Sequence, residues 1–114
     1  MRLDAGDLVL VPFPFSDLTS SKTRPALVLS SRSYNDEGRD IIVCGVTSNL
    51  ANTSHSVLIE ARDMVQGRLV ATSRVKVDKL ATLHQGIVRK RVGAVKPAVM
   101  GQVLKELLAL LPSS

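Results

Sequence analysis

His55 and His84 are the only histidines of the chain, so they are the first candidates for acid–base or metal chemistry. Neither is spaced from a cysteine, an aspartate or the other histidine in a way that is typical of a metal site. The sequence also contains no Gly-rich phosphate loop, no His-Glu-x-x-His pair and no Gly-x-Ser-x-Gly turn. We therefore expect no metal ion and no cofactor. Either histidine could be a general base, although we interpret His84 as structural.

The remaining reactive side chains are few. Cys44 ends the apolar run Ile41–Cys44, which predicts a buried, structural thiol in a reducing compartment. Asp7 and Asp17 could suggest a catalytic carboxylate pair, but they are ten positions apart with two prolines between them. We therefore interpret Asp7 as structural, because a shared acid–base site requires two carboxyl groups close together.

Short runs of strand-forming residues alternate with turn-forming residues along most of the chain. The expected strands cover residues 8–13, 25–29, 41–47, 57–61, 69–72 and 75–80. The prolines in Pro12–Phe15 cannot donate ladder hydrogen bonds, so this segment should end the first strand and open a polar loop from Ser16 to Thr23. Further polar loops are expected at 31–39 and 48–55. This pattern predicts a mainly β protein, with a compact antiparallel sheet or barrel.

One long helix is expected near the C-terminal end, where Pro97 suits the first helical position and apolar residues recur every three or four positions up to Leu111. Only Lys105 and Glu106 are charged at its centre, so its apolar stripe should pack on the sheet of its own subunit. The chain has 114 residues and no repeat or linker, which predicts a single domain over residues 1–114.

Positive charge is concentrated in the second half of the chain. Residues 1–50 carry five Lys and Arg against six Asp and Glu (net −1), and residues 51–114 carry ten against four (net +6). Such a basic half can bind a polyanion, although solvated basic surfaces without a partner are also common. No stretch reaches the roughly 18 uncharged residues that a membrane span needs. We expect neither secretion nor membrane insertion, and hence a cytoplasmic protein.

Four segments carry a family resemblance when they are read together. They are GDLVLVPFPFSD at 6–17, KTRPALVLS at 22–30, CGVTSN at 44–49 and SRVKVDKLATL at 73–83, followed by RVGAV at 91–95. Each is only a hydrophobic strand with a polar end, but the ordered set closely resembles the MazF/PemK family of toxin–antitoxin ribonucleases. Leu10 is a departure, because many members place an aromatic residue there.

The resemblance implies a small SH3-like barrel with a C-terminal helix, built as a symmetric homodimer whose groove receives single-stranded RNA. It implies a type II toxin, that is, a metal-independent, sequence-specific endoribonuclease that inhibits translation and growth. It also implies a cognate antitoxin protein as partner. The two central catalytic positions of the family fall on Arg24 and Thr47.

These two residue types suit RNA cleavage. The ribose 2′-hydroxyl is the substrate's own nucleophile, so an enzyme need only align it and stabilise charge on the phosphoryl oxygens. Arg24 offers a planar fork of donors that stays charged, and Thr47 offers a hydroxyl for the scissile phosphate. The products would be a 2′,3′-cyclic phosphate, or the 3′-phosphate derived from it, and a 5′-hydroxyl. A solvated strand-start arginine and a turn-closing threonine are the alternatives.

Further RNA contacts are expected from the polar loops and from the fourth segment of the resemblance. These residues are Phe15, Ser16, Lys22, Thr23, Ser48, Asn49, Ser73, Lys76, Asp78 and Lys79. For the three lysines a solvated basic face is equally open. Two other functions also remain open on the same fold: a CcdB-like toxin that binds DNA gyrase, and a non-catalytic RNA-binding barrel.

Overall fold

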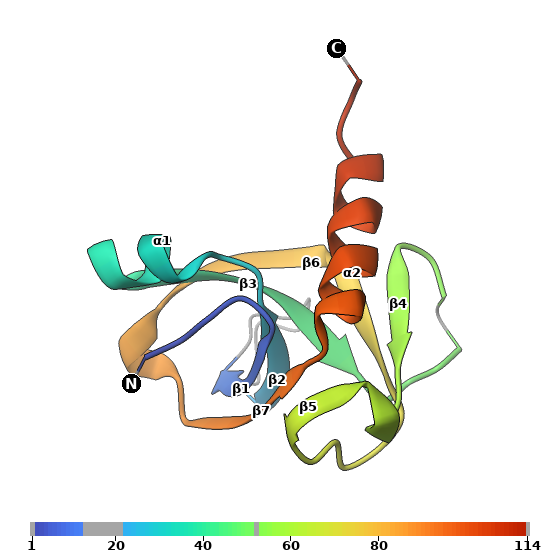
Figure 1. Ribbon diagram of the computed structural model, residues 1–114, viewed down its shortest axis with the longest axis horizontal. Coiled ribbons are helices and arrows are strands. Elements are labelled where there is room, and N and C mark those ends of the chain that lie inside the picture. Colours follow the sequence, from blue (N-terminus) through green and yellow to red (C-terminus); the bar gives the residue numbers. More distant parts are fainter. Residues whose placement is uncertain (1, 13–21, 52, 114) are drawn as a thin grey trace.

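The computed structural model describes residues 2–12, 22–51 and 53–113. Within these ranges seven strands form one curled antiparallel sheet in the order β4-β6-β3-β2-β1-β7-β5 (Figure 1). The strands are β1 Asp7–Pro12, β2 Thr23–Val28, β3 Asp40–Thr47, β4 Ser56–Ile59, β5 Met64–Gly67, β6 Ser73–His84 and β7 Lys90–Val95. The predicted mainly β, barrel-like fold with a C-terminal helix is therefore confirmed.

Two apolar clusters fill the two faces of the curled sheet. Leu8 of β1 belongs to the first cluster, and its neighbour Val9 belongs to the second. This alternation follows from the period of two along a strand, which turns successive side chains to opposite faces. Both faces of β1 are therefore buried along most of its length. Cys44 lies fully buried in the first cluster, as its apolar neighbours predicted.

The helix α2 runs from Pro97 to Ala109 and packs on β4 and β6. Pro97 stands in its first turn, where a missing N–H costs no helical hydrogen bond. Val99 and Val103 are buried in the first cluster, so packing on the sheet of the same chain is confirmed for this side of the helix. Leu104 and Leu108 are exposed on α2, and Leu111 is exposed just after its end, so apolar side chains remain on this surface.

Three short helical turns connect the strands. They are α1 Arg32–Glu37, η1 Ala61–Asp63 and η2 Gln85–Ile87. The helix α1 lies inside the segment that was expected to be a loop, and the hydroxyl of Ser31 caps it by accepting a hydrogen bond from the backbone of Tyr34.

The strand predicted at 69–72 is wrong, because these residues form the loop between β5 and β6. The strands β5 and β7 were not predicted. Gly67 ends β5 with a φ of 72°, a left-handed conformation that turns the chain away from the sheet. It also pairs with Gly93 at close range, since an added Cβ on Gly67 would lie 2.6 Å from the Gly93 Cα. This close backbone approach requires glycine.

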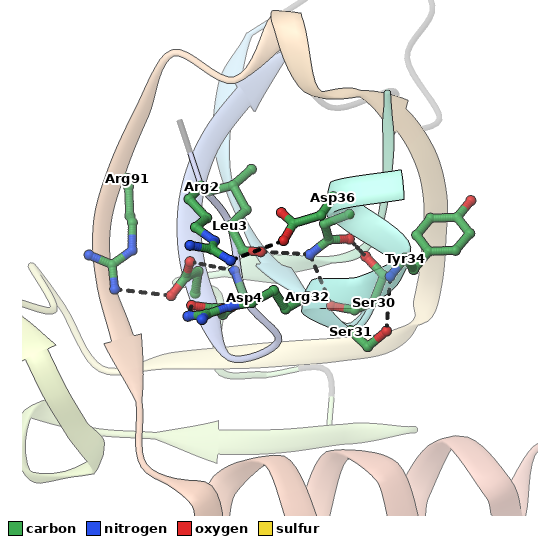
Figure 2. A network of polar contacts seen from close by, with 11 residues as sticks. Arg2, Leu3, Asp4, Ser30, Ser31, Arg32, Tyr34, Asp36 and Arg91 are labelled. Atoms are coloured by element: carbon green, nitrogen blue, oxygen red, sulfur yellow. Dashed lines mark hydrogen bonds and ion pairs between the residues drawn. The ribbon is translucent and has the colours of Figure 1, made fainter. Parts of the chain in front are cut away.

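Polar contacts tie the segment before β1 to α1 (Figure 2). Arg32 of α1 forms an ion pair with Asp4, with Nε and Oδ1 2.5 Å apart, and this hydrogen bond is the main cause that lowers the pKa of Asp4. The side-chain amide of buried Asn35 donates to the Leu3 carbonyl at 2.9 Å. The backbone N–H of Asp4 donates to the carboxylate of Asp7 at 2.9 Å. These contacts fix the entry into β1, the strand at the centre of the site below.

Candidate functional site

A pocket of about 590 Å³ opens where β2 begins and β3 ends. Its apolar lining comes from Leu8, Leu10, Pro25, Val46 and Val92, on four neighbouring strands. Residues 68–71 form another part of the lining, and they overlap the segment 69–72 that was expected to be a strand. Arginine, lysine and hydroxyl side chains complete it, and none of the described residues that line it is acidic.

The structure brings Arg24 and Thr47 together in this pocket. The strands β2 and β3 pair in a register that sets Ala26 against Gly45, and the same register continued to the strand ends sets Arg24 opposite Thr47. On its other side Thr47 pairs with Arg74 of β6. Thr47 thus pairs with Arg74 on one side and shares the pocket with Arg24 of the strand on its other side.

The hydroxyl of Thr47 has a defined local role. Its Oγ1 accepts a hydrogen bond from the backbone N–H of Asn49 at 3.1 Å, which forms a small turn at the end of β3. A hydroxyl has one donor hydrogen as well as its acceptor lone pairs. The turn therefore holds the oxygen in place and leaves its hydrogen to be donated into the pocket, so the turn and a phosphate contact are compatible.

Sequence analysis did not single out three other cations of the pocket, Arg68, Lys90 and Arg91. Arg68 follows the turn at Gly67, and Lys90 opens β7. Within the described part of the chain the exposed side chains of Arg68 and Lys90 form no ion pair. The concentration of positive charge after residue 50 was the only signal for them in the sequence.

Arg91 is held differently, because its guanidinium already has partners. Nη2 lies 3.1 Å from the carboxylate of Asp7 and donates to Gln66 Oε1 at 2.7 Å. Asp7 is almost fully buried, and its hydrogen bond raises the pKa of Arg91. Figure 2 shows Arg91 reaching from its strand toward the N-terminal segment. Asp7 does not line the pocket and acts as a structural anchor, in agreement with the prediction.

Several of the predicted RNA-contacting residues lie in or beside the pocket. Ser48 and Ser73 line it, and Ser73 Oγ donates to the Ala71 carbonyl at 2.8 Å, which steadies the pocket loop. Asn49 is exposed next to Ser48. Lys22 and Thr23 are exposed at the start of β2, beside Arg24. Phe15 and Ser16 lie outside the described residues.

Three predicted contacts on β6 are not brought to the pocket. Asp78 and Lys79 are exposed within a bulge, which arises because Cys44 pairs with Leu80 whereas the next residue, Gly45, pairs with Lys76. Lys76 is only 5% exposed, and its Nζ donates to the carbonyl of Ser54 at 2.8 Å. None of the three is among the lining residues.

The histidines and the cysteine lie outside the pocket lining as well. His84 Nδ1 accepts a hydrogen bond from the backbone of Gly86 at 2.8 Å, which caps η2 and gives it a structural role. Burial raises the pKa of the Cys44 thiol to about 12.

Among residues 2–12, 22–51 and 53–113, no group of His, Cys, Asp and Glu side chains is arranged to hold a metal ion. No helix in these ranges is long and apolar enough to cross a membrane.

The arrangement suits an anion that carries an apolar or planar group. Guanidinium, ammonium and hydroxyl donors can hydrogen-bond phosphate oxygens, and the apolar lining can take a base or another flat group. Carboxylates in the same place would repel a phosphate, and none of the described lining residues provides one. The pocket thus combines phosphate-binding donors with an apolar surface.

Fold and pocket together define a small basic β-barrel protein with a cationic pocket over the inner strands of its sheet. The chain belongs to the PemK-like, MazF-like toxin family of type II toxin–antitoxin systems, whose family model matches residues 4–111. No sequence among curated proteins matches the chain significantly.

Several solved structures share the fold of this chain. MazF from Deinococcus radiodurans (Form-I) is 28% identical, with 96% of each chain covered and a TM-score of 0.78. MazE-MazF (Form-III) from the same organism is 27% identical, with 100% of each chain covered and a TM-score of 0.79. An endoribonuclease from Mycobacterial species shares the fold at 21% identity, with 100% of this chain and 97% of that chain covered and a TM-score of 0.77.

Proposed function

We propose that this toxin-family chain is a metal-independent, sequence-specific endoribonuclease that cleaves single-stranded RNA. The observation that carries the proposal is the meeting of Arg24 and Thr47 in one pocket, together with Arg68 and Lys90 and without an acidic residue in the described lining. Such a pocket can stabilise the extra negative charge that a phosphodiester develops during cleavage. The Mycobacterial relative of the same fold is itself described as an endoribonuclease.

In the proposed reaction the 2′ oxygen forms a bond to phosphorus and the bond from phosphorus to the 5′ oxygen breaks. The guanidinium of Arg24 hydrogen-bonds the phosphoryl oxygens as their charge grows, and the hydroxyl of Thr47 holds the scissile phosphate in line. The 2′ proton passes to water, because no carboxylate or imidazole is among the described residues that line the pocket. The 5′ oxygen leaves with a proton from Arg24 or water. The products are a 2′,3′-cyclic phosphate, or its 3′-phosphate, and a 5′-hydroxyl.

The proposal includes two protein partners. A second copy of the chain would complete the RNA groove, and the exposed side chains of Leu104 and Leu108 on α2, with Leu111 just after it, support a contact between subunits. An antitoxin would silence the enzyme, as the MazE-MazF complexes among the similar structures suggest. In this proposal residues 1–114 act as one domain in the cytoplasm, where cleavage of mRNA inhibits translation and growth.

The decisive test compares the wild type with Arg24→Ala on long single-stranded RNA in EDTA, with cut sites and end groups mapped by sequencing. We expect wild-type cuts with cyclic-phosphate ends and a loss of about a hundredfold or more in the variant. Arg39→Ala is the matched control, because Arg39 is also exposed but lies outside the pocket lining. RNA left intact by the wild type, together with normal growth on induction, would show that the proposal is wrong.

A further inference from the structure

Lys76 is a buried cation that the proposed chemistry does not use. It lies on β6, only 5% exposed, between the core residues Val75 and Val77. Its ammonium donates to the main-chain carbonyl of Ser54 at 2.8 Å. Burying an ammonium group is costly unless a polar partner replaces the lost water, and here a backbone oxygen in a loop is such a partner. The position therefore calls for an explanation beyond packing.

Arg74 makes the same kind of contact two residues earlier on β6. Its Nε donates to the carbonyl of Leu50 at 3.0 Å, and its Nη1 lies 3.4 Å from the hydroxyl of Ser56. Arg74 and Lys76 thus each bind a carbonyl oxygen of the connection between β3 and β4. Contacts to backbone carbonyls depend on the path of a loop and not on its side chains, so the two cations restrain the shape of this connection.

The restrained connection, residues 48–51 and 53–55, is called here the rim loop. It begins with Ser48, which lines the pocket directly after Thr47. At its other end the His55 carbonyl accepts a hydrogen bond from the backbone N–H of Val77 at 3.0 Å. His55 has a φ of 51°, a left-handed conformation that a non-glycine residue keeps only when the surrounding contacts hold it there. The rim loop is therefore held from both ends by β6.

The side chains of the rim loop are polar and exposed around its held backbone. Ser48, Asn49, Thr53, Ser54 and His55 are all exposed. Serine, threonine, asparagine and histidine can each both donate and accept hydrogen bonds, which is the chemistry that reads the edges of unpaired bases. A loop of this kind can discriminate bases only if its backbone keeps one shape, because a mobile loop would adapt to each base.

We propose that Lys76 and Arg74 are positioning residues that hold the rim loop beside the pocket, so that its side chains select the bases next to the cut. This inference rests on the proposed ribonuclease function. It assigns Lys76 an indirect role in place of the phosphate contact that the sequence suggested. Neither residue touches the RNA in this scheme, and both act through the loop backbone.

The test uses Lys76→Met and Arg74→Met, which keep most of the apolar stems and remove the donors. Lys105→Met on α2 is the control, since Lys105 is an exposed lysine outside the pocket lining and the rim loop. Amide hydrogen exchange measures the restraint of the loop without RNA. The N–H of Val77, which donates to the His55 carbonyl, reports on Lys76. The N–H of Ala51, which donates to Asn49 Oδ1, reports on Arg74. Cleavage of an RNA pool with a random segment, read by sequencing, reports base preference.

We expect exchange at these amides to accelerate about tenfold, which matches the loss of one charge-assisted hydrogen bond. We also expect a weaker base preference and a higher KM on the preferred site with little change in kcat, because the loop contacts bind ground state and transition state alike. Unchanged exchange would overturn the restraint. Faster exchange with an unchanged base preference would overturn the selective role.

Two controls separate the possible failures. If Lys76→Met does not fold, as judged by circular dichroism, Arg74→Met decides the question, because Arg74 is only half-buried and its removal leaves the core intact. If the wild type leaves RNA uncut, the proposed function fails and the selective role fails with it. The exchange measurement in that case still shows whether β6 restrains the rim loop.

Discussion

Thr47 and Arg74 are partners across β3 and β6, and Thr47 shares the pocket with Arg24 of β2, the strand on the other side of β3. The end of β3 therefore carries a hydroxyl that lies in the pocket with one arginine and pairs with a second arginine that binds the rim loop. A change at Thr47 should affect the chemistry without unfolding the protein, since Thr47 lies at a strand end and is only partly buried.

Thr47→Val and Thr47→Ser separate the hydroxyl from the shape of its side chain. Valine keeps the branched shape but can neither donate to phosphate nor accept from the N–H of Asn49, whereas serine keeps both functions. We expect the valine variant to lose about tenfold to a thousandfold in kcat and the serine variant to retain most of it. Single-turnover cleavage of one defined RNA measures both, and equal rates for the two variants would contradict a role for the hydroxyl.

Arg68→Gln and Lys90→Gln test whether these two exposed cations of the pocket bind phosphate. Each cation that neutralises a phosphate releases counterions, so each variant should reduce the slope of log affinity against log salt by about 0.7 for single-stranded RNA. Fluorescence anisotropy at several salt concentrations measures the slope, with Arg24→Ala as the background to prevent cleavage. Lys105→Gln should leave the slope unchanged. If Arg68→Gln and Lys90→Gln also leave it unchanged, the RNA binds elsewhere.

Asp7→Asn tests the ion pair between buried Asp7 and Arg91 of the pocket lining. The change removes a charge that pairs with Arg91 at 3.1 Å and leaves the guanidinium without its carboxylate. We expect a loss of about 2 kcal/mol in the free energy of unfolding, measured by urea denaturation. The double variant with Arg91→Met should cost less than the sum of the two single changes, because the groups interact directly. Additive losses would show that the pair is not coupled.

The ion pair of Asp4 and Arg32 predicts a small dependence of stability on pH. The hydrogen bond from Arg32 lowers the pKa of Asp4 below its ordinary value of 3.8 in the folded protein. A lowered pKa means that the charged carboxylate stabilises the fold above that ordinary value and that this contribution is lost as the pH falls through the folded pKa. The wild type should therefore exceed Asp4→Asn in stability at about pH 6, and the difference should shrink at about pH 2.

Urea unfolding at the two pH values measures this difference. Both side chains are well exposed, so the effect should be small and should weaken in high salt. A difference that grows as the pH falls would contradict the assigned sign.

The sequence predicted the strands that contain a continuous run of apolar, strand-forming residues, but not those that depend on distant contacts. Residues 41–47 form β3 because Ile41, Val43 and Val46 fit a sheet with both faces buried. Residues 69–72 have similar local preferences, yet the turn at Gly67 leaves them without a neighbouring strand. The strand β7 opens with two charged residues and contains a glycine, so its strand character comes from pairing with β1 and β5.

The candidate site could be predicted only in part for the same reason. Arg24 and Thr47 were found through an ordered set of motifs, and they meet in the pocket because β2 and β3 are neighbouring antiparallel strands. Arg68 and Lys90 reach the pocket through a loop and a strand that come from the far end of the sheet order, which local sequence does not reveal. Lys76 was expected to reach solvent or RNA. No neighbouring residue in the sequence indicates that its ammonium group would be buried and would donate to the Ser54 carbonyl.

The bulge at residues 77–79 divides β6 into two independently registered halves. Residues 73–76 set the pairing that contains Thr47, and residues 80–84 set the pairing with the first half of β3. A residue gained or lost inside the bulge could be absorbed there, whereas the same change on either side would turn the following side chains to the opposite face of the sheet. The bulge thus lets the part of β6 that follows it vary in length, while the pairing of Thr47 with Arg74 keeps its register.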